Sequence, residues 1–192
     1  MKKALVTLVL LVVSVLAFGQ IKDEPTKFLG IPVDGDAKEF VEKVKQKGFT
    51  FTGYDKNGAH FKGTFAGYPN CEIIAGITPK SNLAWAVAVD FETPDNWQGL
   101  YSMYTAAKKQ LEKEYGPADM VQEEFEGGDP GSDAQRYTEV EIGRCHYNTI
   151  YKTGNGLIRL CIHTDEDNNP STILAYLNAI NQMKFESEQQ DD

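Results

Sequence analysis

The stretch that decides the fold is LAWAVAVDF, residues 83–91. Every residue in it except Asp90 is apolar, and large side chains alternate with alanines. Alternate residues of an extended chain point to opposite faces of a sheet. One face then carries Leu83, Trp85, Val87, Val89 and Phe91, and the other carries Ala84, Ala86 and Ala88. Because both faces are apolar, the pattern predicts a central strand of a sheet.

The residues before this strand predict an antiparallel meander. A turn at 55–58 joins strands at 49–54 and 59–66, and a turn at 79–82 joins strands at 70–78 and 83–91. The first turn contains Asn57-Gly58, which is a strong hairpin signal because both residues tolerate a positive φ. Connections this short join neighbouring antiparallel strands.

Three helices are predicted around the strands. Asp36 and Glu39 form a capping box that starts the first helix, over about 37–47. A second helix over about 97–115 ends at Gly116-Pro117. A third is predicted from residue 171 onward, with an apolar stripe of Ile173, Leu174, Leu177 and Ile180. Further strands are predicted at about 120–125, 144–152 and 157–164.

This order of elements predicts the fold class. We expect an α+β protein with an antiparallel sheet of seven or more strands and helices on one face. The chain also divides into two stretches in which a helix is followed by strands. Two helix-plus-meander halves are therefore an alternative description of the same order.

The two ends of the chain predict its domain limits. Lys2 and Lys3 precede an apolar run that ends at Ala17-Phe18-Gly19, which is typical of a cleavable signal peptide over 1–19. A retained membrane anchor is the alternative. We expect a single α+β domain over 20–185, an acidic flexible tail over 186–192, and no membrane span in the mature chain. The protein is thus predicted to be exported, to the periplasm or out of the cell.

Charge and cysteine content exclude several classes of function. The chain has a formal net charge of −9, and cleavage would remove two further lysines. Such a surface repels the phosphates of nucleic acids, so no nucleic-acid partner is expected. The three cysteines, Cys71, Cys145 and Cys161, include no CxxC pair of the kind found in zinc knuckles and thioredoxin-type sites.

Several segments together resemble a known group of proteins. They are Phe28–Gly35, Lys47–Phe49, Phe65–Cys71 and Glu114–Pro117. With the signal peptide, they resemble an uncharacterised family of secreted or periplasmic proteins of Bacteroidetes, for which no activity is established. The resemblance therefore implies an exported protein and assigns no role to any residue. The helix-plus-meander halves are also similar in architecture to the β-lactamase-inhibitor-protein fold and to small outer-membrane-assembly lipoproteins.

The last predicted hairpin contains the candidate metal ligands. A turn at 153–156 would place His146 beside His163 on one face, with Cys161 two residues from His163. Imidazole and thiolate are ligands for soft metals such as zinc. The alternative is an ordinary half-exposed sheet face with two unrelated imidazoles. The same alternation places Cys145 on the opposite face, so Cys145 and Cys161 are not expected to form a disulfide.

Aromatic residues supply the candidate binding face. Tyr54, Tyr68, Trp97 and Tyr101 are predicted to form an aromatic rim or face of the kind used by binding modules. The alternative for Trp97, and for Trp85, is core packing. The loop at 127–133 lacks the ligand spacing of a calcium loop, whereas the denser acidic cluster at 165–169 is either a weak calcium site or a solvated turn.

No motif in the chain indicates a particular reaction. It contains no GxSxG, HExxH, phosphate-binding or dinucleotide-binding signature. We therefore expect an exported, non-catalytic binding or interaction domain with no cofactor, whose partner is an unidentified protein or small ligand of the cell envelope. The alternatives are a small exported hydrolase with a site assembled from distant residues, and a metal- or small-ligand-binding protein. An enzyme should show a closed pocket with convergent groups of shifted pKa, whereas a binding module should show an open aromatic surface.

Overall fold

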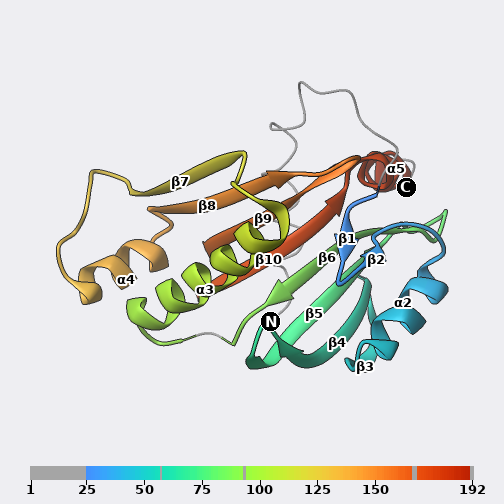
Figure 1. Ribbon diagram of the computed structural model, residues 1–192, viewed down its shortest axis with the longest axis horizontal. Helices are drawn as coiled ribbons and strands as arrows, with labels where there is room; N and C mark the ends of the chain where they lie inside the picture. Colours follow the sequence, from blue (N-terminus) through green and yellow to red (C-terminus); the bar gives the residue numbers. More distant parts are fainter. Residues whose placement is uncertain (1–24, 57, 93, 166–167, 191–192) are drawn as a thin grey trace.

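An eight-stranded antiparallel sheet forms the centre of the computed structural model (Figure 1). The structure describes residues 25–56, 58–92, 94–165 and 168–190. In sheet order the strands are β3 (Thr50–Asp55), β4 (Gly58–Phe65), β5 (Tyr68–Ile77), β6 (Ala84–Asp90), β10 (Pro170–Asn178), β9 (Gly156–Thr164), β8 (Cys145–Lys152) and β7 (Met120–Phe125). Strands β1 (Lys27–Phe28) and β2 (Ile31–Pro32) form a separate two-stranded sheet. These elements confirm the α+β class with a large antiparallel sheet.

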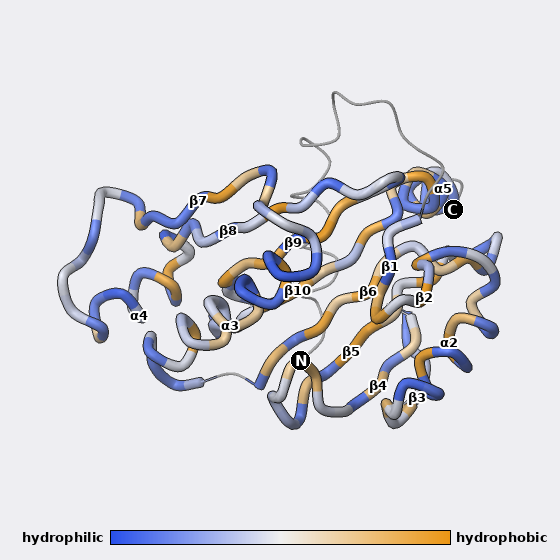
Figure 2. The backbone as a smooth tube through the Cα atoms, in the orientation of Figure 1, coloured by the Kyte–Doolittle hydropathy of each residue, from blue (hydrophilic) through white to orange (hydrophobic). Residues whose placement is uncertain are grey.

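Two helices cover one face of this sheet, one over each half. They are α2 (Ala37–Gln46) and α3 (Trp97–Tyr115), and Figure 1 shows α2 beside β3 and β4, and α3 in front of β8, β9 and β10. The main core lies beneath them, and Figure 2 shows hydrophobic residues concentrated along the central strands. Tyr104 of α3 is fully buried there, and its hydroxyl shares a hydrogen bond of 2.6 Å with Thr149 of β8.

The chain is built from two halves of the same design. Helix α2 precedes the meander β3–β6, and α3 precedes β7–β10, with a further helix, α4 (Asp133–Glu141), inserted after β7. The last strands of the halves, β6 and β10, pair antiparallel at the centre, where Val87 lies opposite Tyr176 and Val89 opposite Leu174. Residues 83–91 are therefore central, as their two apolar faces predict.

The prediction of a third helix from residue 171 is wrong over its first turns. Pro170–Asn178 form β10, and the last helix, α5 (Ala179–Gln190), begins only after it. All nine residues of β10 are buried, including Ile173, Leu174 and Leu177. A strand that is buried on both faces is apolar at every spacing, so it also contains a helical stripe.

Trp85 lies on the opposite face of the sheet from the one predicted. The register between β5 and β6 shifts at Gly76 and Ile77, and this bulge turns the indole away from the main core. Trp85 stacks there on Phe185 of α5, with ring centroids 4.6 Å apart. Gly76 leaves the room that the ring needs, because a Cβ at this position would lie 2.8 Å from the indole.

Residues 186–190 are helical, whereas a flexible tail is predicted over 186–192, of which the last two residues lie outside the described part of the chain. Helix α5 continues to Gln190, and the carboxylate of Glu188 accepts hydrogen bonds from the backbone N–H groups of Lys80 and Ser81. The predicted signal peptide lies outside the described residues. Among the residues that are described, no helix is long and apolar enough to cross a membrane.

Candidate functional site

An open hollow of about 540 Å³ lies where α3, the end of the β7–β8 pair and the start of α4 meet. Its wall combines aromatic, acidic and amide side chains with one arginine. It is lined by Trp97, Gln98, Tyr101, Glu123, Glu124, Phe125, Gly128, Asp129, Asp133, Arg136 and Tyr147. We take this hollow as the candidate binding site and call it the aromatic hollow.

Four aromatic rings form the floor of the aromatic hollow. Trp97, the first residue of α3, is only 5% exposed and packs with its ring centroid 5.2 Å from those of Phe125 and Tyr147. Tyr101 follows one helical turn later and stacks on the indole, yet remains 41% exposed. The helix begins here because the side chain of Asn96 accepts a hydrogen bond from the N–H of Gly99. The floor thus has a fixed base and one ring open to solvent.

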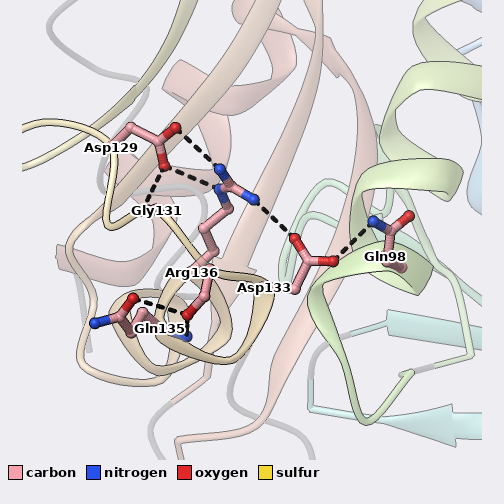
Figure 3. Close-up of polar contacts among 7 residues, drawn as sticks. Gln98, Asp129, Gly131, Asp133, Gln135 and Arg136 are labelled. Carbon is pink, nitrogen blue, oxygen red and sulfur yellow. Dashed lines mark hydrogen bonds and ion pairs between the residues drawn. The ribbon is translucent and has the colours of Figure 1, made fainter.

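Arg136 of α4 organises the rim (Figure 3). Its guanidinium donates two hydrogen bonds to Asp129, from Nε at 3.0 Å and from Nη2 at 2.9 Å, and a third to Asp133 at 2.8 Å. The other carboxylate oxygen of Asp133 accepts a hydrogen bond from Gln98 of α3 at 2.8 Å. These contacts connect the loop after β7, the start of α4 and the start of α3.

The charges around the aromatic hollow are mainly negative. Hydrogen bonds lower the pKa of Asp129, chiefly one from Arg136, and lower the pKa of Asp133, chiefly one from Gln98, so both carboxylates are ionised at neutral pH. Glu123 forms an ion pair with Lys108 of α3. Glu124 also borders the hollow, but its side chain projects to the opposite face of the sheet, where it accepts a hydrogen bond from Gln122. Because each cation is already paired with a carboxylate, the excess charge is acidic.

The structure brings together two of the four aromatic residues that were predicted to share a face. Trp97 and Tyr101 are adjacent, although Trp97 also packs into the core, as its alternative interpretation expects. Tyr54 lies on β3 and is 58% exposed, with its ring against Phe51. Tyr68 begins β5 and packs its ring edge-on against Phe91. The predicted four-residue face is therefore divided between the two halves of the sheet.

The candidate metal ligands lie on the other side of the sheet. The β8–β9 register has the predicted pairs, with Asn148 opposite Cys161 and Ile150 opposite Arg159. His146 and His163 line a second hollow, of about 470 Å³, together with Cys161. Within the described part of the chain, however, no group of three or more His, Cys, Asp or Glu residues is arranged to hold a metal ion. The geometry thus gives the metal hypothesis no support there.

The cysteines behave as buried thiols. Cys145 packs against the main core on the helix-covered face, whereas Cys161 lies in a small cluster with Ile173 and Ala175. All three cysteines are free, so Cys145 and Cys161 are not joined. Burial raises the pKa of the Cys145 thiol to about 12, which leaves it protonated and unreactive at neutral pH.

One carboxyl group on the second face has a strongly shifted pKa. Asp90, at the end of β6, lies opposite Glu72 of β5 and Ile173 of β10. Burial raises its pKa to about 7, a hydrogen bond with Ser171 opposes the rise, and nearby Glu72 adds to it. Asp90 therefore retains a proton at a pH where an ordinary aspartate is ionised.

Sequence reasoning did not identify the polar rim of the aromatic hollow. The segment 127–133 is predicted from the sequence to be a loop without the ligand spacing of a calcium site, and no other role is predicted for its acids. A signal for α4 was nevertheless present, because Ser132 and Gln135 form the two ends of a capping box. A helix starting there would have placed Arg136 one turn from Asp133. Its contact with Asp129 depends on how the loop folds back.

No family model, curated protein or solved structure matches the chain. The resemblance to a family of exported Bacteroidetes proteins therefore stays a prediction. The function must be argued from the geometry of the aromatic hollow itself.

Proposed function

We propose that the protein is an exported, non-catalytic binding domain whose ligand site is the aromatic hollow. The ligand is a cationic group on an apolar stem, of which the side chains of lysine and arginine are the simplest examples. The observation that carries this proposal is the acidic rim around an aromatic floor, with its arginine already bonded to two carboxylates.

The chemistry of the floor favours a cation. A positive charge over an exposed aromatic ring is attracted by the ring quadrupole, and nearby carboxylates strengthen that attraction. Tyr101 supplies the exposed ring, and Asp129, which lines the same hollow, supplies an exposed carboxylate. An anionic ligand would meet repulsion at the same place, because three guanidinium N–H groups of Arg136 already donate to the carboxylates of Asp129 and Asp133.

The composition of the wall favours binding over turnover. The residues that line the aromatic hollow include no histidine, cysteine or serine. These residue types supply most nucleophiles and general bases in enzymes. The strongly shifted carboxyl group, that of Asp90, belongs to the other face of the sheet.

The proposal is tested by titrating the chain without residues 1–19 with N-acetyl-lysine amide, followed by NMR. Two matched ligands keep the stem and change the charge: N-acetyl-norleucine amide is neutral, and N-acetyl-glutamate amide is negative. We expect only the lysine compound to shift the indole N–H signal of Trp97, and the shift should weaken with added salt. The indole of Trp85, on the opposite face, is the internal control. Equal binding of the neutral compound, or preferred binding of the negative one, would contradict the proposal.

A further inference from the structure

Strand β7 forms a regular and exposed edge of the sheet. Its residues 120–125 pair with β8 in an uninterrupted register from Met120–Ile150 to Phe125–Cys145. Met120 and Val121 are 42% and 48% exposed, which is unusual for apolar side chains at a sheet edge. No described strand lies on its other side.

The outward-facing backbone groups of β7 can be identified from the register. The N–H of Glu126 donates to the carbonyl of Arg144 directly opposite, which marks this pair as a hydrogen-bonded position of the ladder. In an antiparallel ladder such pairs alternate with pairs whose N–H and C=O groups point away. The outward groups of β7 are therefore those of Val121, Glu123 and Phe125. The carbonyl of Phe125 accepts a hydrogen bond from the N–H of Gly128, and no other backbone hydrogen bond outside the ladder involves these groups within the described residues.

The opposite edge of the sheet is protected, and β7 is not. Strand β3 has a register shift between Phe51 and Gly53, and Gly53 has a φ of 142°. A bulge of this kind twists an edge strand and prevents it from pairing with another chain. The sequence of β7, MVQEEF, has no proline, glycine or lysine, which are the residues that commonly block an edge.

The edge of β7 and the aromatic hollow are parts of one surface. Glu123 and Phe125 project to the helix-covered face, where Glu123 pairs with Lys108 and Phe125 packs against Trp97. A residue placed directly opposite Glu123 on a neighbouring strand would project to the same face. Its side chain would thus enter the aromatic hollow while its backbone bonds to β7.

We propose that β7 binds an extended segment of a partner protein as a ninth strand, and that a basic side chain of this segment occupies the aromatic hollow. The proposal rests on the proposed function of that hollow. Main-chain hydrogen bonds would supply affinity, and the acidic hollow would select the side chain. Charge favours a basic partner over a second copy of this chain, because a β7–β7 pair would bring together Glu123 and Glu124 of both copies.

The test compares three probes that share the same side chain. They are N-acetyl-lysine amide, the extended peptide acetyl-Thr-Lys-Thr-Lys-Thr-amide, and the same peptide with the backbone nitrogen of each lysine methylated. We expect the unmodified peptide to bind at least about tenfold more tightly than N-acetyl-lysine amide, because it adds backbone hydrogen bonds. It should also slow hydrogen exchange at the amides of Val121, Glu123 and Phe125. The methylated peptide should bind no more tightly than N-acetyl-lysine amide, since its lysines have no backbone N–H to donate.

A proline substitution in the protein tests the same backbone contact without changing the peptide. Val121→Pro removes one outward N–H without touching the aromatic hollow, so the peptide should lose about tenfold in affinity while N-acetyl-lysine amide binds as before. Equal binding of the methylated and unmodified peptides would overturn the ninth strand and leave the proposed function standing. Failure of every lysine probe to bind would overturn the proposed function itself. Concentration-dependent protection of the three amides without peptide would overturn the choice of partner, because it would identify a second copy.

Discussion

Tyr101 stacks on Trp97 one helical turn away on α3, with ring centroids 5.5 Å apart and ring planes 20° from parallel. The two rings have different environments, since Trp97 is 5% exposed and Tyr101 is 41% exposed. The buried indole therefore fixes the position of the exposed phenol. The ring of Tyr101 is therefore held in a fixed position and remains accessible to a ligand.

Replacing Tyr101 should weaken ligand binding with little effect on stability. Tyr101→Ala removes the exposed ring of the floor, and we expect the affinity for N-acetyl-lysine amide to fall about fivefold, equivalent to about 1 kcal/mol. Tyr54→Ala is the matched control, because Tyr54 is also an exposed tyrosine but lies on β3, outside the aromatic hollow. NMR titration measures both affinities. An equal loss in the two variants would show that the effect is not local.

Removing the positive charge of Arg136 should strengthen binding of a cation. Arg136→Gln leaves Asp129 with the N–H of Gly131 and Asp133 with Gln98 as hydrogen-bond donors, so the pKa of each should rise partway toward its ordinary value. The added negative charge at about 7 Å in water should tighten binding of N-acetyl-lysine amide about threefold. Arg136→Lys keeps the charge and is the control, with affinity expected near that of the parent protein. A loss of affinity in the glutamine variant alone would contradict the prediction, because it would show that the positive charge of Arg136 does not oppose the bound cation.

The buried carboxyl of Asp90 should make stability fall as the pH rises from about 4 to about 7. Its pKa in the folded protein is raised to about 7, whereas in an unfolded chain it lies near 4. Between these values the unfolded state releases a proton that the folded state keeps, so unfolding becomes more favourable, by about 4 kcal/mol over the whole interval. Below and above the interval this contribution is constant. Asp90→Asn should remove it, because asparagine cannot ionise.

Urea denaturation of both proteins at pH 4.5, 6 and 8 measures this difference. The comparison between variants is needed because burial lowers the pKa of His163, which acts in the opposite direction and destabilises the fold as the pH falls below about 6.5. If Asp90→Asn leaves the slope of stability against pH unchanged, then the aspartate is not protonated in the fold.

Two neighbouring proline substitutions should have unequal effects on stability. The N–H of Val121 points out of the sheet, so Val121→Pro should reduce the free energy of unfolding by about 1 kcal/mol or less. Gln122 lies opposite Asn148 with its N–H directed at β8, so Gln122→Pro should cost about 3 kcal/mol. Thermal and urea unfolding of both variants measure this. The reverse order would refute the assignment of outward-facing groups on β7.

The sequence predicts the strands well where turns and alternation agree. The hairpin around Asn57-Gly58 and the β8–β9 register both follow from local turn chemistry. Prediction fails at β10 and Trp85, where local signals are ambiguous. A strand that is buried on both faces contains the stripe of a helix, and a bulge that reverses one side chain depends on the neighbouring strand.

The candidate site is less predictable than the fold. Trp97 and Tyr101 lie one turn apart on one helix, so their proximity follows from helical geometry. Arg136, Asp129 and Tyr147 come from different elements, and no local pattern indicates that they meet beside α3. The hydrogen bond from Gln98 to Asp133 joins residues 35 positions apart in the chain.

By itself, the sequence determines the α+β class, the antiparallel meanders and the position of residues 83–91 at the centre of the sheet. These features depend on alternation, turn residues and helix caps, which act over a few neighbouring positions. The tertiary structure alone decides that β6 pairs with β10, that β7 becomes an open edge, and that Arg136 closes the rim beside Trp97. Each of these outcomes depends on which buried surfaces pack together, and that choice is made by the whole core, across large separations in sequence.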